Sequence, residues 1–245
     1  MKQGKPSATA EGLAALRAAE WLAPEDQRAC HDRFARDFIG AKYRIISRSR
    51  LLTRTALWGI ERIVPGIACY LVGRAGYVDG YLETCIDDGI EQLVILGAGY
   101  DSRAYRFDKL KGHVRVFEVD HPATQSSKTA KVRRALGSMP EHVVYVPIDL
   151  DERNLAQGLF ESGYNSSLKT LFIWEGVVSY LTPEAVDETL AFVATNSGEG
   201  SSIIFDYLFQ SALDGTSDLE QVNRMRKAYV RIVERVTFEL SLIHI

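Results

Sequence analysis

The sequence predicts an α/β protein with a Rossmann-like parallel sheet, flanking helices and an N-terminal helical cap. After residue 90, short apolar runs alternate with amphipathic stretches, which is typical of parallel strands joined by crossover helices. Before residue 90, apolar residues recur at helical spacing and no run has the pattern of a strand. We therefore expect a helical cap or lid at residues 10–89 and a ligand-binding sheet domain at residues 90–245.

The helical prediction for the cap depends on the spacing of its apolar residues. Leu13, Leu16 and Trp21 suit one face of a short helix, and apolar residues within 34–39 suit another. A longer helix is expected over residues 70–85, where apolar residues again recur at helical spacing.

Five short apolar runs are the expected strands of the sheet: 92–96, 114–119, 143–148, 171–174 and 203–207. Helices are expected between and after them, at 123–136, 155–162, 183–196 and 218–236. Thr182 is a suitable N-cap for the third of these helices, with Pro183 at its first position. Open parallel sheets bind ligands outside the carboxyl ends of their strands, so the chemistry should follow residues 96, 120, 149, 175 and 206.

Composition and charge narrow the partners. The 245 residues include 29 Lys and Arg against 32 Asp and Glu, and this net charge of −3 argues against nucleic acid or an anionic membrane. Three dispersed cysteines without a C-x-x-C pair predict neither a disulfide framework nor a metal site. Since no secretory signal is visible and no stretch approaches about 18 uninterrupted apolar residues, we expect a cytoplasmic protein.

A glycine turn, Gly97-Ala98-Gly99, follows the first predicted strand. Glycines here allow a sharp turn and let a ligand approach the backbone, although such turns are common after buried strands. A nicotinamide or flavin fingerprint would place a third glycine at the position of Ser102. The missing glycine argues against a site that cradles a pyrophosphate.

Acidic residues close the second predicted strand. Asp120 lies 23 residues after Gly97, close to the spacing at which a carboxylate holds a ribose diol in dinucleotide folds. Glu118 shares a face with Asp120 by strand parity, so either carboxylate could reach the ribose. His121 next to them is interpreted as a hydrogen-bonded spacer.

Further polar residues follow the third, fourth and fifth predicted strands. Asp149 could accept a hydrogen bond from an adenine amino group while Leu150 packs on the ring. Glu175 ends a buried run, where a carboxylate is costly unless it is paired or functional, and we favour function. Tyr180 follows closely enough to line a pocket, and Asp206 is a weaker candidate to face a substrate.

Three motifs in this order resemble the leucine carboxyl methyltransferase family, which includes bacterial O-methyltransferases of secondary metabolism. They are LGAGYDSRAYR at 96–106, FEVDHP at 117–122 and WEGVVSYLTP at 174–183, and the resemblance extends over about residues 26–207. It implies a transferase with S-adenosylmethionine as cofactor, a molecule without a pyrophosphate, which agrees with the missing third glycine.

The resemblance also implies roles for individual residues. Gly97 and Gly99 would border the methionine part of the cofactor, and Asp120 would bind the ribose. The other implied cofactor contacts are Asp149 and Leu150 to the adenine, Glu175 near the amino group, and Arg74 on the carboxylate. An upstream cation contributes in some members, and Arg44, Arg48, Arg50 and Arg54 are left open for this role.

The implied reaction moves a methyl group from a sulfonium to an oxygen of a carboxylate or hydroxyl, on a small molecule or a protein C-terminus. The protein then supplies mainly positioning and exclusion of water. Glu175, Tyr180 and Arg103 are expected to orient the reactants. If the acceptor is a hydroxyl, a base is also needed, for which His121, Glu175 or Tyr207 are candidates.

Two other functions compete with methyl transfer. One is an NAD(P)-dependent oxidoreductase on a similar sheet, which the missing third glycine and the lack of a Tyr-x-x-x-Lys pair disfavour. The other is a non-catalytic descendant that binds the cofactor. Sheets of this methyltransferase class normally finish with an antiparallel hairpin, and this sequence stops after one predicted helix and the run 238–245, so we expect that hairpin to be missing. The sequence leaves the acceptor and the oligomeric state open.

Overall fold

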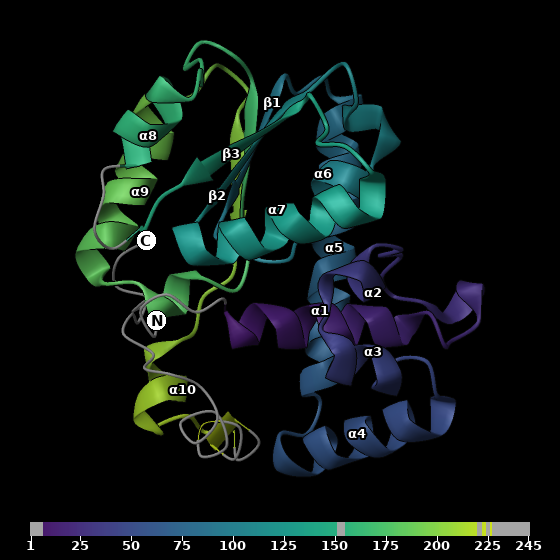
Figure 1. The fold of residues 1–245 in the computed structure, drawn as a ribbon. Coiled ribbons are helices and arrows are strands. Elements are labelled where there is room, and N and C mark those ends of the chain that lie inside the picture. Colours follow the sequence, from purple (N-terminus) through teal and green to yellow (C-terminus); the bar gives the residue numbers. More distant parts are fainter. Residues whose placement is uncertain (1–6, 151–154, 220–221, 224–225, 227–245) are drawn as a thin grey trace.

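The computed structural model describes residues 7–150, 155–219, 222–223 and 226, and its centre is a five-stranded parallel sheet in the order β3-β2-β1-β4-β5 (Figure 1). Every neighbouring pair of these strands is parallel. This topology confirms the predicted Rossmann-like class. The strands are β1 (Gln92–Leu96), β2 (Arg115–Asp120), β3 (Val143–Pro147), β4 (Thr170–Trp174) and β5 (Ser202–Phe205).

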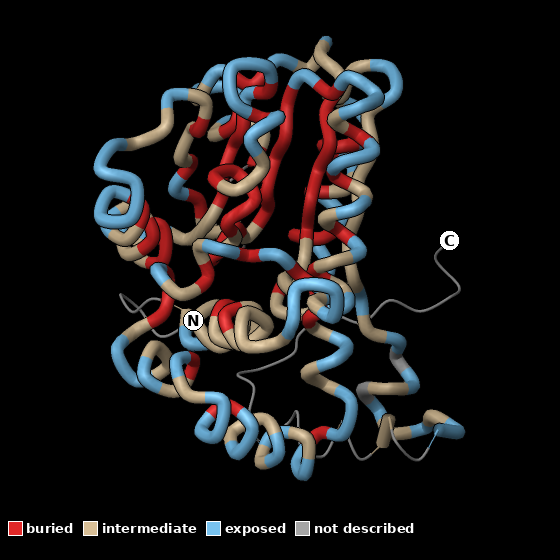
Figure 2. The backbone as a smooth tube through the Cα atoms, turned by 90° about the vertical axis from the view of Figure 1, so that its right-hand side faces the viewer, coloured by how far each residue is buried: buried red, intermediate tan, exposed pale blue. Residues whose placement is uncertain are grey.

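Helices cover both faces of the sheet, as Figure 1 shows. On one face, α5 (Ile67–Asp87) and α7 (Pro122–Leu136) pack over β1, β2 and β3 in one apolar cluster. On the other, α8 (Leu155–Glu161) and α9 (Pro183–Thr195) form a second cluster with alternate residues of the same strands. The central strands β1, β2 and β4 are therefore buried on both sides, as the red segments of Figure 2 show, and read in the sequence as nearly continuous apolar runs, whereas β5 is half-buried throughout.

The N-terminal helices lie at the carboxyl ends of the strands (Figure 1). They are α1 (Ala8–Glu20), the 3-10 turn η1 (Glu25–Gln27), α2 (Ala35–Phe38), α3 (Ala41–Ile46) and α4 (Arg50–Ile63). The Ser7 hydroxyl caps α1 by accepting from the Ala10 N–H, and the Ser7 N–H donates to Thr124 Oγ1 at the start of α7. The sheet edge at which ligands are expected is thus bordered by α1. The division into units at 10–89 and 90–245 stays a prediction.

Short elements flank the strands, three of them after a strand and one, η2, before β2. They are α6 (Arg103–Arg106), η2 (Asp108–Leu110), η3 (Val178–Tyr180) and α10 (Gln210–Asp214), none of which the apolar spacing predicts. The described residues exclude most of the helix expected at 218–236 and the whole run 238–245. The expectation that a terminal hairpin is missing therefore also concerns residues outside the described ones.

Two negative observations concern the described part of the chain. No single helix there is both long and apolar enough to span a membrane, and α4 with α5 passes that test only as a pair bent by 104°. No group of three or more His, Cys, Asp or Glu side chains among the same residues is arranged to hold a metal ion.

Candidate active site

The glycine turn after β1 has a backbone that favours glycine. Gly97 has a φ of +65°, a conformation that residues with a side chain rarely adopt. A Cβ atom added there would lie 2.3 Å from Cγ2 of Val177, which belongs to the loop after β4. The chain at Gly97 therefore needs both the positive φ and the missing side chain to approach that loop.

Asp120 holds the turn from the end of β2. Its carboxylate accepts the backbone N–H of Gly99, and the N–H of Ala98 donates to the carbonyl of Val119 at 2.9 Å. Burial raises the pKa of Asp120 above its ordinary value, although the Gly99 N–H and the charge of Lys128 counteract this rise. Asp120 is thus at the position expected for a ribose-binding carboxylate, directly beside the turn.

The sequence left Glu118 open as the alternative to Asp120 for binding the ribose, but in the structure its side chain lies inside the protein. Its side chain is fully buried one pleat further back in β2. One carboxylate oxygen lies 2.9 Å from Lys128 Nζ, and the other accepts from the hydroxyl of Tyr105 at 2.8 Å. Of the two acids on this face, only Asp120 reaches the sheet edge.

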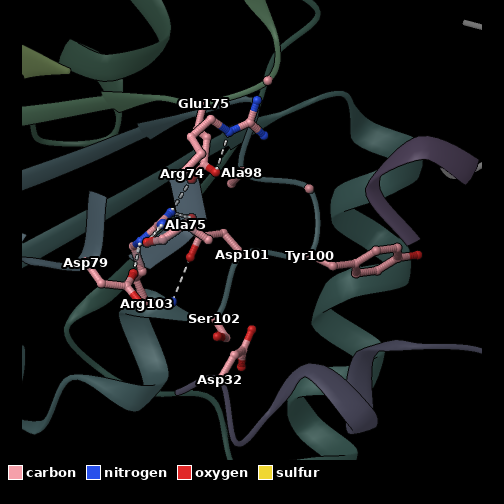
Figure 3. A network of polar contacts seen from close by, with 12 residues as sticks. Asp32, Arg74, Ala75, Asp79, Ala98, Tyr100, Asp101, Ser102, Arg103 and Glu175 are labelled. Carbon is pink, nitrogen blue, oxygen red and sulfur yellow. Dashed lines mark hydrogen bonds and ion pairs between the residues drawn. The ribbon is translucent and has the colours of Figure 1, made fainter. Parts of the chain in front are cut away.

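Glu175 lies between two arginines at the end of β4, where Figure 3 shows it facing them. It accepts from Arg74 Nε at 2.9 Å and from Arg103 Nη1 at 2.8 Å, and its side chain is 16% exposed. Burial alone would raise the pKa of Glu175, but the positive charges of Arg103 and Arg74 outweigh burial and lower it. The buried carboxylate at the end of β4 is therefore paired and ionised.

Arg103, at the start of α6, is the centre of this charge network. Nε donates to Asp79 at 2.8 Å, Nη1 to Asp101 and Glu175, and Nη2 to the carbonyl of Ala75 at 3.1 Å (Figure 3). The side chain is only 3% exposed. Burial opposes the charge of Arg103, yet the surrounding carboxylates raise its pKa well above the ordinary value. Four of its five N–H groups are engaged within the protein.

Arg74 projects from α5 into the same region. Its Nη1 donates to Asp206 at 2.6 Å, and the other oxygen of Asp206 accepts the N–H of Gly176. With Nε held by Glu175, two of the three guanidinium nitrogens are fixed. Among the described residues, no hydrogen-bond partner is found for the third nitrogen, Nη2.

The cation missed by the sequence analysis is Arg17 on α1. Arg17 Nε donates to Asp32 Oδ2 at 2.8 Å, and Nη2 donates to the carbonyl of Tyr100 at 2.7 Å. Arg17 follows the buried Ala14 by three residues, so a charge on the buried stripe of the helix was a usable signal. Its electrostatic influence reaches both Asp101 and Glu175.

The upstream arginines that the sequence left open lie elsewhere. Arg44 of α3 donates to the carbonyl of Ile39, Arg48 is exposed in the segment between α3 and α4, and Arg50 and Arg54 are exposed on α4. In the described part of the chain, none of the four forms an ion pair.

The β3 side of the edge carries Asp149, Leu150 and His121. His121 Nδ1 accepts from the N–H of Ala123 and so caps α7, while Nε2 lies 3.7 Å from Asp149 Oδ2. Leu150 is half-buried against the second apolar cluster. The spacer interpretation of His121 thus corresponds to a helix-capping contact. On the β4 side of the same edge, Tyr180 is half-buried in η3.

The site therefore has two ends on one sheet edge. In the strand order, β3 with Asp149 and Leu150 is separated from β4 with Glu175 by β2 and β1, which carry Asp120 and the glycine turn. Three inter-strand spacings span about 14 Å. An elongated ligand along this edge would meet Asp149 and Leu150, the carboxylate of Asp120, the glycine turn and a cluster of paired charges.

Comparison with known proteins gives a family and a fold. A family model described as leucine carboxyl methyltransferase matches residues 10–194. The Bacillus subtilis protein YktD, assigned as an S-adenosyl-L-methionine-dependent methyltransferase, is 34% identical over 156 residues, covering 64% of this chain and 51% of YktD. A Mycobacterium tuberculosis protein with the same assignment is 32% identical over 237 residues, covering 93% of this chain and 74% of that protein.

Among solved structures, a Thermobifida fusca protein assigned as a methyltransferase shares the fold. It has a TM-score of 0.59 at 13% identity and covers 97% of this chain and 77% of its own. The chain thus spans about half the length of YktD and about three quarters of the mycobacterial and Thermobifida proteins.

Proposed function

The chain belongs to the leucine carboxyl methyltransferase family, and we propose that it transfers the methyl group of S-adenosylmethionine to an oxygen atom of a small molecule or of a protein carboxylate. The assignments of the Bacillus and mycobacterial relatives support the cofactor. The observation that carries the proposal is the arrangement of Asp120, the glycine turn and the Arg74–Glu175 pair along one sheet edge.

The side chains present fit the proposed cofactor at each part of that edge. Asp120 would accept from the ribose hydroxyls, and Asp149 with Leu150 would hold the adenine. Gly97 would border the methionine part, in a turn whose positive φ and contact with Val177 both require glycine. Arg74 offers Nη2 to the cofactor carboxylate, while its other two nitrogens are fixed.

Glu175 fits the cofactor amino group for an electrostatic reason. Two arginines lower its pKa, so it remains a carboxylate at neutral pH and can accept hydrogen bonds from an ammonium group. The same stabilisation makes Glu175 a weak base. Of the three candidate bases for a hydroxyl acceptor, Glu175 is therefore disfavoured, which leaves His121 and Tyr207, while a carboxylate acceptor needs no base.

We assign different roles to the other two expected catalytic residues, Arg103 and Tyr180. Arg103 is buried with four N–H groups engaged, so we assign it to positioning Glu175, Asp101 and Asp79 instead of touching the acceptor. Tyr180, half-buried beside the end of β4, remains the candidate for orienting the acceptor. The bound cofactor supplies an activated sulfonium methyl, and the protein contributes in-line positioning and exclusion of water.

Calorimetric titration of the full chain tests this proposal. Adenosylhomocysteine should bind and NAD should not, and Asp120→Asn should weaken adenosylhomocysteine binding at least about tenfold because a hydrogen bond to a charged group is lost. Asp187→Asn, on the exposed face of α9, is the matched control and should leave the affinity unchanged. Binding of NAD alone would support the oxidoreductase alternative. Tight adenosylmethionine binding without methyl transfer to any carboxylate or hydroxyl acceptor would support a non-catalytic descendant.

A further inference from the structure

A buried ion pair beneath the proposed cofactor site has no assigned role. Lys128 of α7 and Glu118 of β2 are 1% and 0% exposed, and Nζ lies 2.9 Å from Oε1. Burying such a pair costs the hydration of both ions, so stability alone is a weak reason for it. Both charged groups have further contacts that bear on the site.

Lys128 also contacts the glycine turn. Its Nζ donates to the carbonyl of Ala98 at 3.3 Å. The N–H of the same peptide unit belongs to Gly99 and donates to Asp120. Because a trans peptide directs its carbonyl and its N–H to opposite sides, the unit between Ala98 and Gly99 is held from both sides, by a cation and by a carboxylate.

Neighbouring side chains fix the pair. Glu118 Oε2 accepts from the Tyr105 hydroxyl at 2.8 Å, and that hydroxyl lies 3.1 Å from the hydroxyl of Tyr145. Gln125, one turn before Lys128 on α7, donates from Nε2 to the main-chain carbonyl of Glu118 at 2.8 Å. Glu118 is thus held in place and can in turn hold Lys128 against the turn.

We propose that Lys128 is a positioning residue for the cofactor: it orients the Ala98–Gly99 peptide and places a buried positive charge beside Asp120, so that Asp120 presents an ionised carboxylate to the ribose. This inference rests on the proposed function. The electrostatics support it, since burial raises the pKa of Asp120 and the charge of Lys128 lowers it. Glu118 is the counter-charge that makes a buried lysine tolerable.

The competing explanation is that Lys128 only neutralises Glu118. The double variant Lys128→Met with Glu118→Gln separates the two, because it removes both charges and leaves no buried ion unpaired. If Lys128 only neutralises Glu118, this variant should have wild-type stability and wild-type affinity for adenosylhomocysteine. If Lys128 is a positioning residue, the variant should have wild-type stability but an affinity at least about tenfold weaker than that of the wild type.

Two further measurements strengthen the test. The backbone amide signal of Gly99 in a nitrogen–proton spectrum should move in the double variant, because its hydrogen bond to Asp120 is no longer held from the carbonyl side. Glu118→Gln alone leaves Lys128 buried without its counter-charge, so this single variant should be less stable than both the wild type and the double variant. If the Met double variant fails to fold, Lys128→Gln with Glu118→Gln, whose amides can pair, carries the same prediction.

Lys131→Met is the matched control. Lys131 lies one turn further along α7, donates to the backbone carbonyl of Phe38 at 2.6 Å and lies over the ring of Tyr100, but among the described residues it has no hydrogen bond to Gly97, Ala98 or Gly99. Its affinity for adenosylhomocysteine should equal that of the wild type. Wild-type affinity in the double variant would overturn the role of Lys128 alone, whereas a wild-type chain that binds no adenosylhomocysteine would overturn the proposed function.

Discussion

Glu175→Gln tests the charge network on which the site depends. The substitution keeps the shape of the side chain and removes the negative charge that faces Arg74 and Arg103. The amide oxygen can still accept from one arginine, whereas the amide nitrogen turns a donor toward the other. One charge-assisted hydrogen bond is therefore lost and a second is weakened.

The structure limits the size of this effect. Arg103 keeps Asp79 and Asp101 as partners, and Arg74 keeps Asp206, so neither guanidinium is left unpaired. Loss of one hydrogen bond between charged groups costs about 1.5 to 3 kcal/mol, below the cost of an abandoned buried ion. A reduction of about 2 kcal/mol in the free energy of unfolding would lower the melting temperature by about 4 to 8 °C for a chain of this size.

Urea unfolding followed by circular dichroism measures the change, with Glu184→Gln as the matched control. Glu184 is an exposed acid in the first turn of α9, and its substitution should change the free energy of unfolding by less than about 0.5 kcal/mol. The Glu175 variant should also bind adenosylhomocysteine more weakly than the control. Equal stabilities of the two variants would refute the reasoning, because the arginines would then be satisfied by water instead of by Glu175.

Two further predictions follow from the same edge of the sheet. Gly97→Ala should destabilise the chain by about 1 to 3 kcal/mol in urea unfolding, since the new Cβ meets a side-chain carbon at 2.3 Å and φ is +65°; a neutral result would show that the turn can move away. The pKa of Asp101 and that of Glu175 are both lowered in the folded chain, the former against its burial by the charge of Arg103. The two carboxylates therefore stabilise the folded chain fully above their pKa values in the unfolded chain, which are near 4, and this stabilisation is lost as the pH falls further. The midpoint of urea unfolding should accordingly drop between about pH 5 and 3 and change little from pH 6 to 8.

The strands could be predicted well because each of them coincides with a short apolar run in the local sequence. The run at 92–96 is bounded by glycine and is β1 without change. The second run was expected to begin at Val114, which is buried, but its N–H donates to the carbonyl of Leu110 and belongs to the preceding turn. The ladder starts one residue later and extends to Asp120, whose carbonyl accepts from Ile148. Hydrophobicity cannot distinguish these two uses of an apolar residue.

The carboxylates of the site could also be predicted, since each follows a strand and the topology brings the strand ends together. Their cationic partners could not be derived in the same way. Arg17 reaches the carbonyl of Tyr100, 83 residues away, and Lys128 of α7 reaches the carbonyl of Ala98, 30 residues away. Only the tertiary arrangement decides which of 29 basic residues is buried. Arg74 was named by family resemblance and not by any pattern in its surroundings.

The charge balance at the β4–β5 end bears on which ligand this edge suits. Three guanidinium groups and four carboxylates form one connected set of ion pairs there: Arg74, Arg103, Arg106, Asp79, Asp101, Glu175 and Asp206. Within the described residues this set has one more negative than positive charge, and Asp120 adds another nearby. A dinucleotide would bring its pyrophosphate charges toward this excess, which is unfavourable. S-adenosylmethionine carries a net positive charge through its sulfonium, so the same excess would attract it.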